Sequence, residues 1–240
     1  MRVLRSSQRK TTPWKNGGGE TTEIAVSPPG AGLDNFDWRV STARVAKDGP
    51  FSTFPGVDRT LAVLSGAGVS LRVGGRPPVT LTTSTPPFAF PADLPTRAEL
   101  LQDAIADLNV MVRRGKFTHR VTHVPLEAPH SLSVQGTETL LFCVEGMVRV
   151  ETSQGVDTLA SRDALWSEGK NSVWCLSPVA VGFAFLVEIW AAAPSGRVKG
   201  YCALLRGDIL HPCRFRRRGT RWPAFADGRG SRHDWLGLQT

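Results

Sequence analysis

Two short stretches of the chain resemble each other, Leu61-Ala-Val-Leu-Ser-Gly66 and Leu141-Phe-Cys-Val-Glu-Gly146, at an offset of 80 residues. Each is followed by an alternating apolar segment, Val69-Ser-Leu-Arg-Val73 after the first and Val148-Arg-Val-Glu151 after the second, and then by a Thr-Leu step. Alternation with a period of two is typical of β-strands, and a glycine after a strand permits a tight turn. A repeat with a domain-sized period therefore predicts two copies of one β-rich unit.

The segments around this repeat extend the β pattern. Further strands are expected at Thr22–Val26, Asp37–Val45, Thr60–Leu64, Val110–Arg113 and Phe183–Trp190, and turn sequences such as PPGAG, KDGP and VGGRPP separate them. Helical evidence is limited to Thr96–Ala106, which carries a Thr-x-x-Glu capping box, although a strand followed by a turn fits nearly as well. Strand, tight glycine turn, strand and a further strand is the rhythm of a cupin barrel. The sequence thus predicts an all-β bicupin, two cupin-type barrels or jelly rolls in one chain, with few short helices.

The repeat and the charge distribution divide the chain into three parts. We expect an N-terminal barrel over residues 1–115, a C-terminal cupin-like barrel over residues 116–190 and a basic, poorly ordered extension over residues 191–240. The last 50 residues hold ten of the 29 Lys and Arg but only three of the 21 Asp and Glu. Since the rest of the chain is nearly balanced in charge, nucleic-acid binding is not expected of the folded part, and only the extension could contact nucleic acid.

Composition indicates a cytoplasmic protein without a membrane segment. Hydrophobic residues make up 41% of the chain, enough for a sizeable core. The longest apolar stretch, Val179–Val187, falls far short of the ~20 residues of a spanning helix. The first residues contain no apolar stretch typical of a secretory signal, and the four cysteines include no CxxC pair.

Several predicted strands carry polar residues where a buried face is expected. A period of two places Arg39 and Ser41 on one face of their strand and Asn109 and Arg113 on one face of another, while Arg59 begins a third. If these faces line one barrel interior, they form a polar pocket whose guanidinium groups suit a carboxylate. Alternatively, the arginines lie on a solvent-facing side and pair with an acid such as Asp58 or Asp107.

The remaining polar motifs support no catalytic or metal chemistry. The loop Pro13-Trp14-Lys15-Asn16-Gly17-Gly18-Gly19-Glu20 could converge backbone N–H groups on an anion, but it could equally be an ordinary loop. No HxH pair with a downstream Glu is present, so the usual metal site of cupins is not expected in either half. His119 and His123 lie in a strand-like segment and are interpreted as surface or core histidines.

Four motifs in order resemble the HutD/Ves family: PWKNGGGETTEIAV, FDWRVSTARVAKDGPFSTFPGVDRTLAVLSGAGVSL, PPFAFPADLPTRAELL and DLNVMVRRG. The resemblance covers roughly residues 1–190. It implies a bicupin fold without the metal-binding histidines, no cofactor and no firm enzymatic activity. HutD-like proteins are encoded with histidine-utilisation enzymes. The resemblance implies that they tune this pathway by binding a small acidic metabolite such as urocanate, formiminoglutamate or N-formylglutamate. Ves-like members are associated with environmental stress.

The resemblance also assigns a candidate ligand site in the N-terminal barrel. Arg59 or Arg39 would pair with the ligand carboxylate, and Ser41 and Asn109 would hydrogen-bond a second polar group. Other positions on the family motifs, and two aromatic residues expected as apolar walls, complete the set: Lys15, Asn16, Arg113, Phe88 and Phe90.

Two other functions stay open. One is a metal-free hydrolase or isomerase that acts on an acidic intermediate of histidine breakdown. It would need a general acid or base in the pocket, and the sequence identifies none. The other is a cupin used for protein contacts in a stress response, as in Ves-like proteins. The sequence also leaves a homodimer open.

Overall fold

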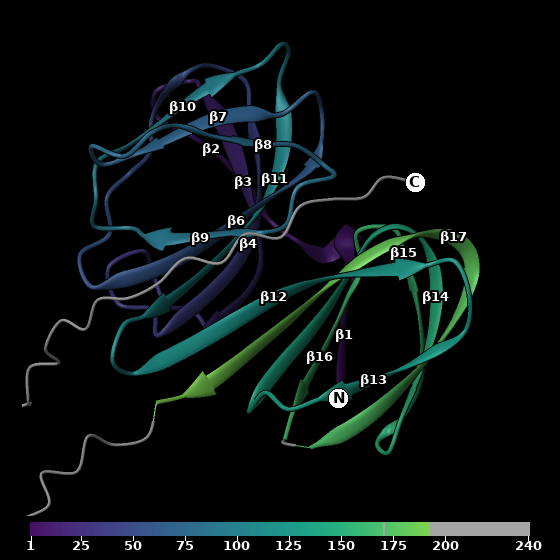
Figure 1. Ribbon diagram of the computed structural model, residues 1–240. Coiled ribbons are helices and arrows are strands. Elements are labelled where there is room, and N and C mark those ends of the chain that lie inside the picture. Colours follow the sequence, from purple (N-terminus) through teal and green to yellow (C-terminus); the bar gives the residue numbers. More distant parts are fainter. Residues whose placement is uncertain (170, 193–240) are drawn as a thin grey trace, which may run out of the picture. The chain divides into compact units, whose positions relative to one another are not determined.

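Strand-forming segments with alternating burial build three antiparallel sheets in this chain, whose computed structural model describes residues 1–169 and 171–192 (Figure 1). The first sheet has the strand order β2 (Thr11–Pro13), β3 (Gly19–Ser27), β4 (Trp38–Val45), β11 (Ile105–Arg113), β6 (Val57–Ser65) and β9 (Phe88–Pro91). The second has the order β5 (Gly49–Pro50), β10 (Thr96–Leu100), β7 (Val69–Val73) and β8 (Val79–Leu81). These two sheets form the N-terminal barrel.

The third sheet forms the C-terminal barrel. Its main path is β1 (Arg2–Leu4), β16 (Ala164–Glu168), β14 (Glu138–Thr152), β17 (Ser172–Ala191) and β12 (Phe117–Leu126). In addition, β13 (His130–Val134) pairs with β17, and β15 (Gly155–Ala160) pairs with β14. The long strands β14 and β17 change register near Glu145, and each contributes to both layers of the barrel.

The predicted elements are present with two differences. The repeat stretch Leu141–Gly146 and the alternating segment Val148–Glu151, expected as two strands joined by a glycine turn, lie in the single strand β14. Thr96–Ala106 is not helical, because Thr96 and Ala98 are buried while Arg97 and Glu99 are exposed, which is the alternation of a strand. The strand-and-turn interpretation of this segment is therefore confirmed. In the described residues the helical content is one 3₁₀ turn, η1 (Ser6–Gln8), and no helix there is long and apolar enough to cross a membrane.

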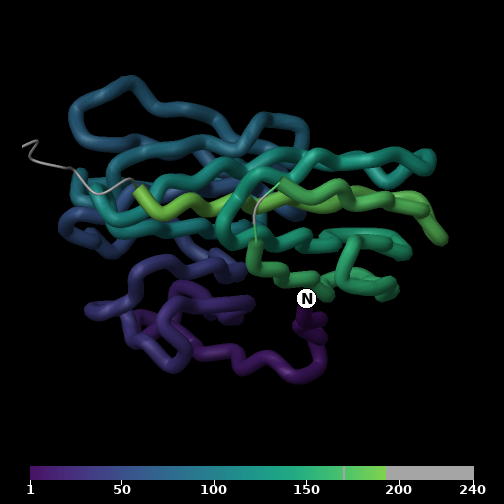
Figure 2. The backbone as a smooth tube through the Cα atoms, turned by 90° about the horizontal axis from the view of Figure 1, so that it is seen from below, coloured from purple at the N-terminus to yellow at the C-terminus, as the bar shows by residue number. Residues whose placement is uncertain are grey.

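The N-terminus crosses to the other barrel. Although the sequence-based boundary places residues 1–115 in the N-terminal barrel, Arg2–Leu4 pairs with Ala164–Trp166 of the C-terminal sheet. Figure 2 shows this first segment, in purple, beside the green strands. Residues 193–240, which include most of the predicted basic extension, lie outside the described residues.

Four apolar cores hold the described residues together, and the smallest of them contains Phe36, Val57 and Met111. One fills the N-terminal barrel around Leu61, Val63 and Leu71, and a second fills the C-terminal barrel around Trp174 and Leu186. The third joins the barrels, because the outer faces of the two large sheets pack against each other. Its members include Trp38, Val40, Leu108, Val110, Phe142, Phe185 and Val187. Since Trp38 and Val40 point into this third core, their neighbours Arg39 and Ser41 point into the N-terminal barrel.

Candidate functional site

Six polar residues gather on the interior face of the N-terminal barrel, and we call them the arginine cluster: Glu23, Arg39, Ser41, Arg59, Asp107 and Asn109. Strand register brings them together. Asn109 of β11 lies opposite Ser41 of β4, which in turn lies opposite Glu23 of β3. Residues that face each other across a ladder share one side of the sheet. The strand register places Arg39, Ser41, Arg59 and Asn109 on the same interior face.

Arg59 is held by Asn109 and by two aromatic rings. Its Nε donates to Asn109 Oδ1 at 2.9 Å, and its Nη2 donates to the same oxygen. The guanidinium carbon lies 4.5 Å from the centroid of the Phe51 ring and 5.7 Å from that of Phe90, so both rings offer cation–π contact. Asn109 Nδ2 donates to Asp107 Oδ1. Asn109 therefore bridges a half-buried cation and a buried carboxylate.

Burial shifts the ionisation of both charged ends of this bridge. Asp107 is only 1% exposed, and desolvation raises its pKa to about 6, against the opposing influence of Arg59 and of the Asn109 hydrogen bond. Desolvation also lowers the pKa of Arg59 to about 10; the charge of Asp107 opposes this shift and that of Arg39 adds to it. Arg59 stays cationic at neutral pH. Asp107 Oδ2 is buried without a hydrogen-bond partner among the described residues.

Arg39 forms the second half of the cluster. Its Nε donates to Glu23 Oε2 at 2.9 Å, and its Nη1 reaches Ser41 Oγ at 3.4 Å. The Arg39 side chain is 13% exposed, whereas that of Glu23 is 39% exposed. Water can therefore reach the cluster at Glu23, while the guanidinium groups lie deeper in the barrel.

The predicted apolar wall is present. Phe88 and Phe90 of β9 lie opposite Leu61 and Arg59 of β6, so they face the same interior. Their rings stack with centroids 5.8 Å apart. Phe90 is buried, and Phe88 packs against the core at its edge.

Three predicted site residues take other positions. Lys15 and Asn16 are exposed in the turn between β2 and β3, where Asn16 Oδ1 accepts a hydrogen bond from the Gly18 backbone N–H. Gly19 of this turn allows close packing, because a Cβ there would lie 2.2 Å from the Arg44 carbonyl oxygen. The glycine loop thus acts as a tight hairpin, and no hydrogen bond or ion pair among the described residues joins Lys15 or Asn16 to the cluster.

Arg113 is a loop anchor. Its Nε donates to the Phe36 carbonyl at 3.0 Å, its Nη1 to that of Pro55 at 3.2 Å and its Nη2 to that of Asp34. Its guanidinium also lies over the Phe36 ring. The N–H groups of Arg113 donate to backbone carbonyls of the loops at one end of the barrel. Arg113 therefore does not lie with Asn109 in the interior, in contrast to the prediction from the sequence.

Two members of the cluster, Glu23 and Asp107, are absent from the site predicted from the sequence, where Asp107 entered only as a possible partner of solvent-facing arginines. Asp107 carried a usable signal, because it lies two residues before Asn109 and shares its face by the same period of two. Glu23 carried none, since its place opposite Ser41 depends on a strand register with a bulge between Glu23 and Ala25.

His119 and His123 have structural surroundings. His119 Nε2 and Thr60 Oγ1 are 2.7 Å apart, and burial lowers the pKa of His119 to about 4. His123 stacks on Phe183 with ring centroids 5.1 Å apart. Within residues 1–169 and 171–192, no three His, Cys, Asp or Glu side chains are grouped as a metal site.

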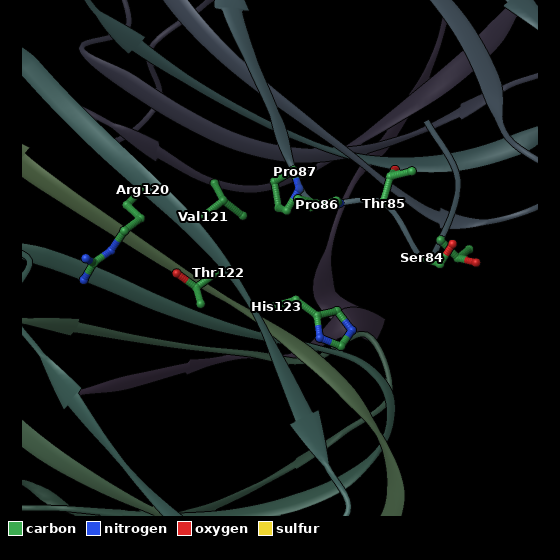
Figure 3. A pocket seen from close by; sticks show the side chains of 9 residues that line it. Ser84, Thr85, Pro86, Pro87, Arg120, Val121, Thr122 and His123 are labelled. Carbon is green, nitrogen blue, oxygen red and sulfur yellow. The ribbon is translucent and has the colours of Figure 1, made fainter. Parts of the chain in front are cut away.

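An open groove of about 470 Å³ lies elsewhere, between the β8–β9 loop and β12 (Figure 3). The residues that line it run from Thr83 to Pro87 and from Arg120 to His123. Arg120 is already paired with Glu188 at 2.6 Å. The groove shares no residue with the arginine cluster, so we treat it as a separate surface feature.

Two cupin barrels in one chain, one of them with a cluster of charged residues in its interior, define a bicupin with a candidate ligand site. The profile of the HutD family matches residues 6–181, and the chain belongs to this family. An uncharacterized 21.2 kDa protein from the hutC 3′ region of Pseudomonas putida is 34% identical over 174 residues, 72% of this chain and 90% of that protein. Protein Ves from Citrobacter koseri is 33% identical over 169 residues, 69% and 82% of the two chains.

Solved structures agree with this assignment. HutD from Pseudomonas fluorescens superposes with a TM-score of 0.68 at 30% identity, over 80% of this chain and 99% of that one. Oxalate decarboxylase from Bacillus subtilis superposes with a TM-score of 0.56 over 79% and 76% of the two chains, at only 9% identity. The second likeness supports the cupin fold alone.

Proposed function

We propose that this protein is a non-enzymatic binder of a small carboxylate metabolite and that the bound state tunes histidine utilisation. The ligand would occupy the interior of the N-terminal barrel. N-Formylglutamate, formiminoglutamate and urocanate are the candidate ligands, since each combines a carboxylate with a second polar group.

The observation that carries this proposal is the set of donors left over in the arginine cluster. An arginine has five N–H donors. Among the described residues, no hydrogen bond engages Nη1 of Arg59 or Nη2 of Arg39. A carboxylate has the charge and the paired oxygens that such donors require. Ser41 and Asn109 lie beside them and could orient a formyl oxygen or a ring nitrogen.

The family gives independent support. The Pseudomonas putida relative is named for its place in the hutC 3′ region, which links it to histidine utilisation. The structure of HutD from Pseudomonas fluorescens was obtained in a formate condition. Formate is the smallest carboxylate, and a formyl group is part of one candidate ligand.

Thermal unfolding of the full chain tests the proposal. The panel would hold N-formylglutamate, formiminoglutamate, urocanate, histidine, glutamate and formate, each with and without EDTA. A ligand that binds only the folded state raises stability by RT ln(1 + [L]/Kd), so binding in the millimolar range is still detectable. We expect a selective stabilisation that survives EDTA.

Two variants locate the site. Arg59→Ala should remove the stabilisation, because it deletes a half-buried ligand-facing cation. Arg72→Ala is the matched control, since Arg72 is an exposed arginine on β7 of the same barrel. The proposal would be contradicted if the ligand stabilised both variants equally. It would also be contradicted if no compound of the panel stabilised the wild-type chain.

One observation favours a metal-free enzyme as a second candidate. Asp107 is buried, has a pKa of about 6 and leaves Oδ2 unpartnered, which suits a general acid or base. Prolonged incubation of each panel compound with the protein, followed by proton NMR, separates the two functions. If a product forms with the wild-type chain and does not form with Asp107→Asn, the protein is an enzyme and not a non-enzymatic binder.

A further inference from the structure

The outside of the C-terminal barrel carries an unusual number of exposed apolar side chains. Eight large apolar side chains are markedly exposed among the described residues, and five of them lie on β14, β15 and β17: Met147, Val156, Val173, Val179 and Val181. Val181 is 74% exposed, Val179 63% and Val173 59%. Single exposed apolar residues are ordinary, but a group on one sheet marks an interaction site.

Strand register places four of these five side chains, all but Val181, on one surface. Along β17 the exposed Val173 and Cys175 alternate with the buried Trp174 and Leu176, so they point away from the barrel interior. Cys175 lies opposite Glu151 of β14, and Glu151 lies opposite Val156 of β15. We call this surface the outer C-face and define it by Met147, Arg149, Glu151, Val156, Val173, Cys175 and Val179. The polar Ser131, Ser133, Thr158 and Ser177 lie on the same face between and beside them.

The N-terminal barrel provides an internal comparison. Its small sheet has the corresponding strand order, since β7 lies between β8 and β10 as the distal half of β14 lies between β15 and β17. The outward side chains of the small sheet are polar: Ser70, Arg72, Thr80, Arg97 and Glu99. Two barrels built on one plan therefore differ on the same outer layer, and the fold itself does not require the apolar surface.

We propose that the outer C-face binds the same face of a second copy of this chain in a two-fold dimer. The choice of a second copy as the partner rests on two charged residues of β14, the central strand of this face. Arg149 and Glu151 are both exposed on β14, two residues apart on the same side. No ion pair engages either of them within the part of the chain that the structure describes.

The surface is self-complementary about a two-fold axis that lies in the plane between the two faces. This axis runs at a right angle to β14 and passes midway between Arg149 and Glu151. It places Arg149 over Glu151 of the second copy, and the reverse, as an isologous interface requires. Val173 lies beyond Glu151 along the face, and Val179 lies beyond Arg149. The same axis therefore brings Val173 of one copy toward Val179 of the other, and apolar contacts surround a central pair of ion pairs.

Sedimentation velocity of the full chain over a range of micromolar concentrations tests the dimer. We expect a concentration-dependent dimer whose dissociation constant rises at least about tenfold in Val173→Lys, since a charge replaces a desolvated apolar contact. Thr80→Lys is the matched control, because Thr80 is exposed on the corresponding layer of the N-terminal barrel. It should dimerise like the wild-type chain.

Charge exchange tests the geometry of the pairing. Arg149→Glu and Glu151→Arg should each weaken the dimer, because each brings like charges together. The double variant should restore it, since the two-fold arrangement regains opposite charges. A wild-type chain that stays monomeric, equal behaviour of the two lysine variants, or no recovery in the double variant would overturn the proposal. Ligand binding in the other barrel plays no part in these outcomes.

Discussion

Asn109 faces Leu61 across the β11–β6 ladder of the N-terminal barrel, whereas Leu186 faces Leu141 across the β17–β14 ladder of the C-terminal barrel. The internal repeat makes Leu61 and Leu141 equivalent. Two residues along, Asp107 faces Val63, while Ala184 faces Cys143. One barrel thus places an amide and a carboxylate at the positions where the other places leucine and alanine.

This difference shows which polar interior residues belong to the candidate site and are not required by the cupin fold. The C-terminal barrel shows that the cupin plan accepts apolar residues at the positions of Asn109 and Asp107. Its buried Glu188 accepts hydrogen bonds from Arg120 and from the backbone N–H groups of Gln135 and Gly136. Buried charges without full hydrogen bonding are unfavourable for folding. The arginine cluster is therefore an addition that the fold does not require, and the proposed ligand binding would account for its place in a barrel interior.

The largest effect is expected from moving the polar residue to the apolar barrel. Leu186→Asn should destabilise the protein by about 3–5 kcal/mol, because it removes buried packing and leaves an amide without partners. Chemical denaturation checks this value. The reciprocal change Asn109→Leu should abolish ligand binding and also cost stability, because it removes the hydrogen bonds that bridge Arg59 and Asp107. If Leu186→Asn were tolerated as well as a surface change, the two interiors would not differ as described.

The next largest effect concerns affinity. Arg59→Ala should weaken carboxylate binding by about 2–5 kcal/mol, or roughly 30-fold to several thousand-fold, as expected when one partner of a buried charge pair is truncated. Isothermal titration with the best ligand of the panel measures this change. Arg59→Lys should recover only part of the affinity, since a lysine cannot donate in a bidentate manner. Unchanged affinity in Arg59→Ala would remove this residue from the site.

Asp107 should make stability depend on pH. Its folded-state pKa, about 6, lies above its ordinary value, so the folded protein keeps a proton that the unfolded chain releases between about pH 4 and pH 6. The contribution of Asp107 to the free energy of unfolding therefore falls as pH rises through this window, by roughly 1–3 kcal/mol. Asp107→Asn should lack this fall. The difference in unfolding free energy between the two proteins at pH 4 and pH 7 isolates the effect from that of His119.

A smaller effect is expected on binding itself. A bound anion near Asp107 disfavours the ionised carboxylate, so binding and proton uptake are coupled. Affinity for a carboxylate should therefore rise severalfold as pH falls from 7.5 to about 6, and this rise should vanish in Asp107→Asn. Titrations in buffers of different ionisation enthalpy reveal the proton uptake. A wild-type affinity that fell over this range would place the ligand away from Asp107.

Strand periodicity predicted much of the site, because the side of a strand on which a residue lies follows from the local alternation of the sequence. The side on which Arg39, Ser41 and Asn109 lie follows from the period of two, and the repeat predicted the two barrels. Glu23 could not be found in this way, since its place depends on register and a bulge. The period of two puts Arg113 on the same face as Asn109. However, Arg113 lies at the end of its strand, where nearby loop carbonyls accept its hydrogen bonds. Lys15 and Asn16 lie in a hairpin whose direction the sequence does not determine.

The arginine side chains themselves offer the most direct test of the account. Arg39 and Arg59 lie in the N-terminal barrel, and Arg120, which pairs with Glu188, serves as a reference in the C-terminal barrel. Proton–nitrogen NMR of the arginine Nε–H groups would follow a titration of the full chain with N-formylglutamate and with formate. We expect saturable shifts of the Arg39 and Arg59 signals and an unchanged Arg120 signal. Unchanged Arg39 and Arg59 signals at saturating ligand, or shifts confined to Arg120, would contradict a carboxylate site in the N-terminal barrel.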